Sequence, residues 1–190
     1  MHATLATSIW PAARTNWLVQ LFLVGLGVAA LTIASKLSVP LWPVPVTMQT
    51  LAIFMIGAAY GPALALSTVL VWLAGSAAGL PLLEGIKSGP AVFLGGTGGY
   101  LVGFPIAAYV AGWVTSRDQG RSWLTALLAF VLAEVIIMGL GFAWLMNLKS
   151  ADIAWTYGVK PFLIGDALKI AIATFLTPMA WRALSGRSDL

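Results

Sequence analysis

Long apolar segments, separated by short polar, proline-rich or glycine-rich stretches, make up most of the chain. A helix that crosses a bilayer needs roughly 17–25 predominantly apolar residues, and six segments approach or reach that length. The pattern therefore predicts an all-α integral membrane protein with six transmembrane helices, built as a single membrane domain over residues 1–190. The expected spans cover residues 17–35, 46–60, 63–80, 97–115, 123–145 and 162–184.

Proline and glycine mark the breaks between these segments. The three prolines of LSVPLWPVPV exclude a continuing helix after the first span, so an extended loop is expected to lead into the second. The Gly61-Pro62 pair separates the second span from the third. The stretch PLLEGIKSGPAVFLGG predicts a polar loop before the fourth span, and Pro178 is expected to kink or end the sixth.

The basic residues indicate an orientation in the membrane. An even number of spans places both termini on one side, together with five arginines, while four lysines fall on the opposite side. The positive-inside rule then predicts cytoplasmic termini. The long irregular loops would face outward together, so the protein is expected to capture something from outside. The arginines are Arg14, Arg117, Arg121, Arg182 and Arg187, and the lysines are Lys36, Lys87, Lys149 and Lys160.

Composition supports a lipid environment and excludes several classes of function. Hydrophobic residues make up 60% of the chain and charged residues 8%, whereas about 25% of a typical soluble domain is charged. The net charge of +4 is therefore interpreted as membrane orientation rather than nucleic-acid binding. There is no cysteine, and the single histidine, His2, lies at the N-terminus, so neither a metal nor a cofactor is expected. No phosphate-loop motif or common hydrolase signature occurs, and no enzymatic activity is predicted.

Two opposite charges inside the sixth apolar segment are the strongest candidates for a binding site. Asp166 and Lys169 are three residues apart and so share one helix face, about 6–11 Å from the outer end at ~1.5 Å per residue. Each charge costs about 2.5–3.5 kcal/mol near the centre of a spanning helix, and such residues usually face the protein interior or a watery cavity. We expect the pair to present an acceptor and a donor to a ligand pocket. The alternative is an ion pair that only neutralises itself.

Other polar residues are weaker candidates. Glu134, in the middle of the fifth span, is interpreted as a ligand contact, a proton site, a partner of Lys169 or a hydrogen-bonded structural residue. Lys87 lies in a predicted outer loop, where most lysines are simply solvated. Thr47 and Gln49 open the second span, where both would otherwise cap the helix.

Small residues predict close helix packing. Ala30 and Ala34 are four residues apart in the first span, and Gly95, Gly99 and Gly103 repeat at the same spacing into the fourth. Such faces allow helices to approach closely within a bilayer. Internal packing is expected for the glycines, whereas the alanine pair either packs internally or docks another membrane protein.

Three stretches in a fixed order resemble a known family. PVPVTMQTLAIFMIGAAYGP, AGSAAGLPLLEGIKSGPAVFLGGTGGYLVGF and GVKPFLIGDALKIAIA resemble the BioY family, the biotin-specific substrate-capture (S) components of energy-coupling-factor (ECF) vitamin transporters. The resemblance extends from about residue 18 to residue 184. It implies an S-component fold with a pocket near the outer face, a bacterial cytoplasmic-membrane location, and high-affinity biotin capture from the extracytoplasmic side.

The resemblance also implies roles for individual residues. Asp166 and Lys169 match the substrate-binding Asp and Lys of the family's GDxLK motif. Lys87 stands where family members often have an arginine, and it is expected to meet the carboxylate of biotin as a point charge. The face formed by Ala30 and Ala34 is expected to dock a transmembrane coupling protein that carries two cytoplasmic ATPases. Further expected substrate contacts are Trp42, Phe93, Tyr100 and Gln49, and the proline-rich loop is expected to close over the ligand.

Three alternative functions stay open at this stage. The chain could be an S component for another small vitamin. It could be a proton-coupled carrier that works alone through Glu134 and Asp166. It could also be a structural membrane subunit, in which the Asp166–Lys169 pair would affect stability but no ligand affinity.

Overall fold

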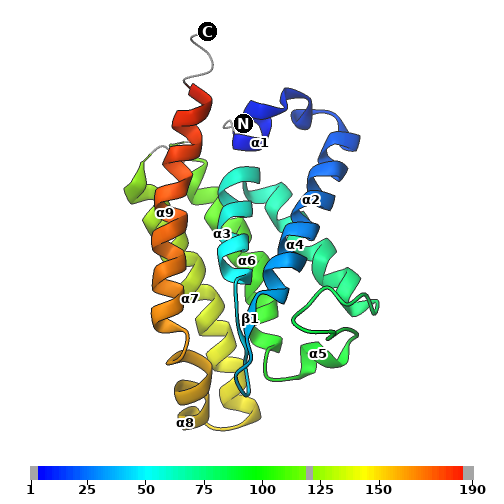
Figure 1. Cartoon of the computed structure of the whole chain (residues 1–190), viewed down its shortest axis with the longest axis vertical. Coiled ribbons are helices and arrows are strands. Elements are labelled where there is room, and N and C mark those ends of the chain that lie inside the picture. The colour runs from blue at the N-terminus through cyan, green and yellow to red at the C-terminus, as the bar shows by residue number, and fades with distance from the viewer. Residues whose placement is uncertain (1–3, 119–121, 186–190) are drawn as a thin grey trace.

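Helices account for most of the chain and run roughly along one direction (Figure 1). The computed structural model describes residues 4–118 and 122–185. The helix α1 and the C-terminal part of α9 lie at one end, called here the terminal end; the β1–β2 hairpin, α5 and α8 lie at the opposite, loop end (Figure 1). The elements in chain order are α1 (Leu5–Ile9), η1 (Pro11–Arg14), α2 (Trp17–Lys36), β1 (Ser38–Val39), β2 (Val46–Thr47), α3 (Gln49–Tyr60), α4 (Pro62–Ala77), α5 (Ala91–Leu94), α6 (Gly98–Thr115), α7 (Trp123–Leu148), α8 (Ala151–Ile153), η2 (Ala154–Val159) and α9 (Leu163–Ser185).

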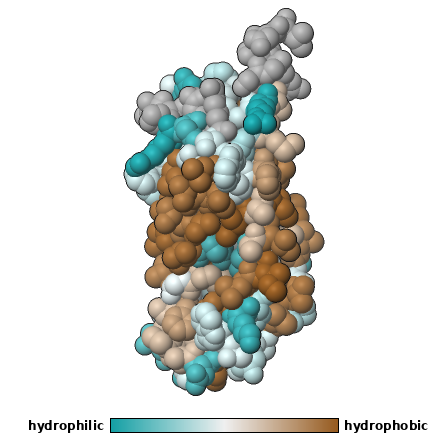
Figure 2. Space-filling view, turned by 90° about the vertical axis from the view of Figure 1, so that its left-hand side faces the viewer, coloured by the Kyte–Doolittle hydropathy of each residue, from teal (hydrophilic) through white to brown (hydrophobic). Residues whose placement is uncertain are grey.

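Four of these helices are long and apolar enough to cross a membrane. They cover Trp17–Lys36, Gly98–Thr115, Trp123–Leu148 and Leu163–Leu184, and α3 and α4 are shorter apolar helices. On the face shown in Figure 2, apolar residues form a broad band between two more polar ends. An apolar band of this kind suits the hydrocarbon layer of a bilayer, so the fold is that of a multi-pass membrane protein.

The second and third predicted spans are longer than the helices that form. Val46 and Thr47, placed at the start of a span by the sequence pattern, instead pair with β1 as an antiparallel hairpin. At the other break, Gly61 has a φ of +77°, and Pro62 occupies the first turn of α4. A positive φ is readily accessible to glycine, and proline tolerates the first helical turn, so this pair reverses the chain tightly. In α9, Pro178 lies inside the helix, which continues to Ser185.

Glycines bring α6 against its neighbours, as the sequence spacing predicted. A Cβ added at Gly99 would lie 2.3 Å from the backbone oxygen of Leu140 in α7, and one added at Gly103 would lie 3.0 Å from the Cα of Ile137. At the crossing of α3 and α6, a Cβ at Gly57 would lie 2.8 Å from the Cβ of Ala111. These helices can pack at this distance only because the side chains are missing. Internal packing therefore explains the glycine repeat of the fourth span.

At the loop end, one lysine ties together two segments that the sequence predicted as separate loops. The Nζ of Lys36, the last residue of α2, donates to the carbonyl oxygens of Pro81 (2.7 Å), Leu83 (2.6 Å) and Gly85 (2.5 Å). The chain between α4 and α5 is therefore anchored beside the start of the β1–β2 hairpin. This placement positions both segments around the site described next.

Candidate ligand-binding site

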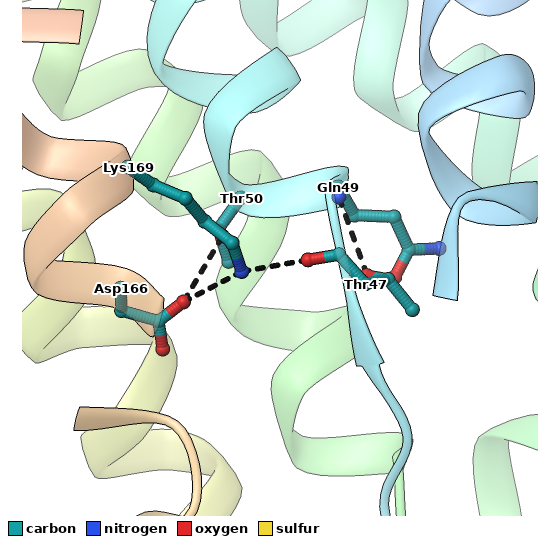
Figure 3. Close-up of polar contacts among 5 residues, drawn as sticks. All are labelled: Thr47, Gln49, Thr50, Asp166 and Lys169. Atoms are coloured by element: carbon teal, nitrogen blue, oxygen red, sulfur yellow. Dashed lines mark hydrogen bonds and ion pairs between the residues drawn. The ribbon is translucent and has the colours of Figure 1, made fainter. Parts of the chain in front are cut away.

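Asp166 and Lys169 face the protein interior rather than lipid. Their ion pair measures 2.7 Å between Nζ and Oδ1, and both side chains are buried. The Nζ of Lys169 also donates to the backbone oxygen of Thr47 at 2.6 Å, and the hydroxyl of Thr50 lies 3.4 Å from Oδ1 of Asp166. Figure 3 shows the pair reaching from α9 toward the hairpin end and the start of α3. The pair is therefore more than a self-neutralising contact within one helix, because it joins three elements.

A cavity opens beside this pair at the loop end. It comprises about 580 Å³ of space between atoms, a figure that includes its opening to solvent. Most of its wall is apolar, with a polar group at the buried side and Glu84 and Lys87 on the outer loop. The lining residues are Val44, Pro45, Thr47, Gln49, Thr50, Leu83, Glu84, Lys87, Val92, Thr97, Tyr100, Leu101, Phe104, Ile137, Met138, Phe162, Asp166 and Lys169.

Thr47 and Gln49 divide between them the two roles that the sequence left open, capping and ligand contact. The hydroxyl of Thr47 donates to the side-chain oxygen of Gln49 at 2.8 Å and lies 3.2 Å from its backbone N–H, so Thr47 covers the start of α3. Both residues are buried and line the cavity. Among the described residues, no hydrogen bond occupies the side-chain nitrogen of Gln49, which can therefore donate to a ligand.

Lys87 and Tyr100, two of the expected substrate contacts, also line the cavity, but each already has a partner. The Nζ of Lys87 lies 2.5 Å from a carboxylate oxygen of Glu84; the Lys87 side chain is 53% exposed and that of Glu84 18%. The hydroxyl of Tyr100 donates to the backbone oxygen of Gly158 at 2.6 Å, and its ring stacks on Phe162 with centroids 6.2 Å apart. Tyr100 therefore offers an aromatic wall rather than a free hydroxyl, and Lys87 offers a cation near solvent.

Two aromatic residues predicted as pocket walls lie outside the cavity lining. Trp42 is 66% exposed and packs edge-on against Tyr157, with the Nζ of Lys149 5.7 Å from its ring centroid. It belongs to the segment between β1 and β2, and the hairpin holds it at the surface. Phe93 is half-buried against the core from α5, whereas its neighbour Val92 lines the cavity. The predicted wall role of these two residues does not match this arrangement.

The predicted docking face on α2 is divided between surface and interior. Ala30 is exposed, whereas Ala34 is buried at 9% exposure. One turn before Ala30, Gly27 faces α4, where an added Cβ would lie 2.5 Å from Cγ2 of Thr68. Small residues on α2 therefore serve internal packing in part, and only Ala30 of the predicted pair lies on the surface. Of the residues used to infer orientation, Arg121 and Arg187 lie outside the described residues, as does His2.

The sequence analysis missed one residue of the site, Thr50, and left the role of another, Glu134, open. Thr50 contacts Asp166 across the fold; its spacing of three residues from Thr47, inside an apolar helix, was the available signal. Glu134 is buried in α7, and its carboxyl group lies close enough to Asp166 and Lys169 for their charges to interact. The sequence had left its role open.

Comparison with known proteins gives consistent matches over nearly the whole chain. The model of the BioY family matches residues 5–186. The chain is 34% identical over 157 residues to a probable biotin transporter BioY of Pyrococcus horikoshii, covering 83% of this chain and 93% of that protein. It is 31% identical to the biotin transporter BioY of Thermotoga maritima, covering 83% and 92%. The crystal structure of an S-component for biotin from an ECF-type ABC transporter superposes with a TM-score of 0.76 at 25% identity, over 88% of this chain and 94% of that one.

Proposed function

The chain belongs to the BioY family, and on that premise we propose that it captures biotin as the S component of an ECF-type transporter. The observation that carries this proposal is the buried Asp166–Lys169 pair beside a mostly apolar cavity, in a fold similar to that of a biotin S-component. The relatives named as biotin transporters support the same substrate. A transport role without catalysis agrees with the absence of hydrolase motifs from the sequence.

The cavity suits the chemistry of biotin at both of its ends. Biotin has an apolar fused ring with two ureido N–H donors and a carbonyl acceptor, and a carboxylate on an apolar tail. Asp166 accepts hydrogen bonds, while Lys169 and the side-chain nitrogen of Gln49 donate them, all at the buried side. Lys87 lies on the more exposed side. We therefore place the ureido ring at the buried polar group and the carboxylate toward Lys87.

In this binding mode Lys87 would exchange one carboxylate for another. Its present partner, Glu84, lies three residues earlier in the same loop. An incoming carboxylate would compete with Glu84 for the same ammonium group, and an exposed ion pair of this kind contributes only about 0–1 kcal/mol. The exchange therefore costs little, and Lys87 contributes modestly to affinity.

Two loop-end segments are placed to close over bound biotin. The hairpin segment that contains Pro40, Pro43 and Pro45 ends at Thr47, whose carbonyl accepts from Lys169. The second segment, the chain between α4 and α5, is held to α2 by Lys36. Because Lys169 contacts both the hairpin and the proposed ligand position, ligand binding and hairpin position would be coupled through this one side chain.

The orientation and the partners of the protein complete the proposal. We place both termini on the cytoplasmic side of a bacterial cytoplasmic membrane, with six membrane-spanning helices and the loop end outside. The exposed surface of α2 around Ala30 would contact a transmembrane coupling protein, and two ATPase subunits would supply the energy. The lack of a phosphate-loop motif in this chain suits that division of roles.

Equilibrium binding of radiolabelled biotin to the purified protein in detergent tests this function. We expect saturable binding that unlabelled biotin displaces and other vitamins do not. Saturable binding of a different vitamin alone would retain the S-component role but reject the substrate. Uptake into liposomes that contain only this chain, driven by a pH gradient, would instead support the proton-coupled carrier.

A further inference from the structure

Glu134 is a buried carboxyl group for which the proposed binding mode has no use so far. It lies in the middle of α7, is 8% exposed, and neither carboxyl oxygen has a hydrogen-bond partner among the described residues. Ile137 and Met138, about one turn further along α7 toward the loop end, line the cavity. Glu134 therefore lies just below the cavity, on its terminal side.

The neighbours of Glu134 are the two charged residues of the site. Its carboxyl group lies close enough to interact with the carboxylate of Asp166 and the ammonium group of Lys169. Oδ1 of Asp166 already has Lys169 and Thr50 as partners, but Oδ2 is buried and without a hydrogen bond among the described residues. In Figure 3, this second oxygen likewise has no dashed contact. Three buried carboxyl oxygens of Glu134 and Asp166 therefore lie near one another without a hydrogen-bond donor among the described residues.

Charge balance indicates how this deficit is resolved. Lys169 supplies one positive charge and is paired with Asp166 at 2.7 Å. Two further polar side chains near Asp166 carry no charge: the hydroxyl of Thr50 from α3, and Tyr100 from α6, whose hydroxyl donates to Gly158. A second ionised carboxylate would be an uncompensated charge inside the protein, and nearby carboxylates in one site do not both ionise readily. A proton on Glu134 leaves the cluster neutral.

We propose that Glu134 is a positioning residue of the ligand site, which carries a proton and donates its O–H to Oδ2 of Asp166. This hydrogen bond satisfies the unpartnered oxygen and fixes the rotation of the Asp166 carboxylate, whose other oxygen is held by Lys169. Asp166 thus presents its remaining acceptor positions to the ligand in one orientation. The inference rests on the proposed function, since the ligand that benefits is the ureido group of biotin. The proton stays on Glu134 during binding and is not transported.

Two substitutions at one position test this role. Glu134→Gln keeps the shape, a neutral side chain and an N–H donor, so its biotin affinity at neutral pH is expected to stay within about threefold of wild type. Glu134→Leu removes the donor and is expected to weaken biotin binding at least tenfold. Asp152→Asn makes the same kind of change at an exposed acidic residue of α8, outside the cavity lining, and serves as the control that should leave biotin affinity unchanged. Equal losses in Glu134→Gln and Glu134→Leu would overturn the proposal.

Infrared spectroscopy provides a test that does not depend on biotin. The difference spectrum between wild type and Glu134→Gln, recorded at neutral pH without ligand, is expected to contain the carbonyl band of a protonated carboxylic acid. The difference spectrum for Asp152→Asn, at an exposed acidic residue, is expected to contain a carboxylate band instead. A carboxylate band for Glu134 would overturn the inference even if biotin binds. A wild-type protein that binds no biotin would reject the proposed function, while the infrared band would still decide whether Glu134 is protonated.

Discussion

Replacing Lys169 with methionine removes the one cation of the buried cluster while it preserves most of the side chain's volume. In the native structure its Nζ makes two short contacts, to Oδ1 of Asp166 at 2.7 Å and to the backbone oxygen of Thr47 at 2.6 Å. Lys169→Met therefore leaves Asp166 as an unpaired buried charge and releases the hairpin end. We expect lower stability and weaker biotin binding together.

The size of both effects follows from these two contacts. A hydrogen bond to a charged group contributes about 1.5–3 kcal/mol, so two contribute about 3–6 kcal/mol to stability. Removal of one member of a buried ion pair costs about 3–5 kcal/mol by independent reasoning, and the two ranges overlap. Biotin binding would lose only the contacts between Lys169 and the ligand. We expect the affinity to fall by more than tenfold, which corresponds to about 1.4 kcal/mol.

The assay combines thermal unfolding in detergent with equilibrium biotin binding. Asp166→Asn is measured alone and together with Lys169→Met. Because the double variant has no unpaired charge, it should be more stable than Lys169→Met, whereas its biotin affinity should stay low. Lys160→Met, at an exposed lysine of the loop end, is the control and should change neither property.

Two results would refute this reasoning. If Lys169→Met folds and binds biotin with wild-type affinity, the pair does not form the ligand site, and the structural-subunit alternative gains support. If the double variant is no more stable than Lys169→Met, the unpaired Asp166 charge is not the source of the lost stability.

Further predictions concern the loop end and the helix interfaces. Lys87→Ala should weaken binding of biotin by up to about fivefold, because an exposed ion pair contributes at most about 1 kcal/mol. Binding of the uncharged biotin amide should stay unchanged. An equal loss of affinity for both ligands would show that Lys87 does not bind the carboxylate. Lys36→Met should speed biotin dissociation in stopped-flow measurements, since it frees three loop carbonyls, whereas Lys160→Met should not; identical rates would exclude a closing role for this loop. Gly99→Ala should cost about 1–3 kcal/mol of stability through overpacking, because the added Cβ would meet an α7 backbone oxygen at 2.3 Å. Gly139→Ala, where nothing lies within 4 Å, should leave thermal unfolding unchanged or slightly raise its midpoint.

The general fold could be predicted from the sequence because long apolar segments indicate which parts of the chain lie in lipid. Apolar run length sets which segments can cross a bilayer, and the glycine spacing of the fourth span indicated the close contact that Gly99 and Gly103 make with α7. The exact start of α3 was not accessible. The local sequence at Val46 and Thr47 does not exclude a helix. These two residues belong to a hairpin because they pair with β1.

The candidate site was predicted in part for the same reason. Asp166 and Lys169 stand out because charge inside a membrane helix is costly, and their shared face follows from helical spacing alone. Trp42 and Phe93 were predicted as candidate walls of the pocket, but the structure places neither in its lining. Their positions depend on how the hairpin and α5 dock, and no local pattern encodes that.

The sequence by itself determined that the protein is helical and embedded in lipid, and that two opposite charges share one face of a helix. Both conclusions depend only on residues close together in the chain, through the length of apolar segments and the spacing of residues on a helix. Only the tertiary structure decided what that pair touches. The contact from Lys169 to Thr47 joins residues 122 positions apart, and the nearness of Glu134 to Asp166 depends on the packing of α7 against α9. Such contacts are fixed by how whole helices pack, since each side chain's partner is chosen by the elements that surround it.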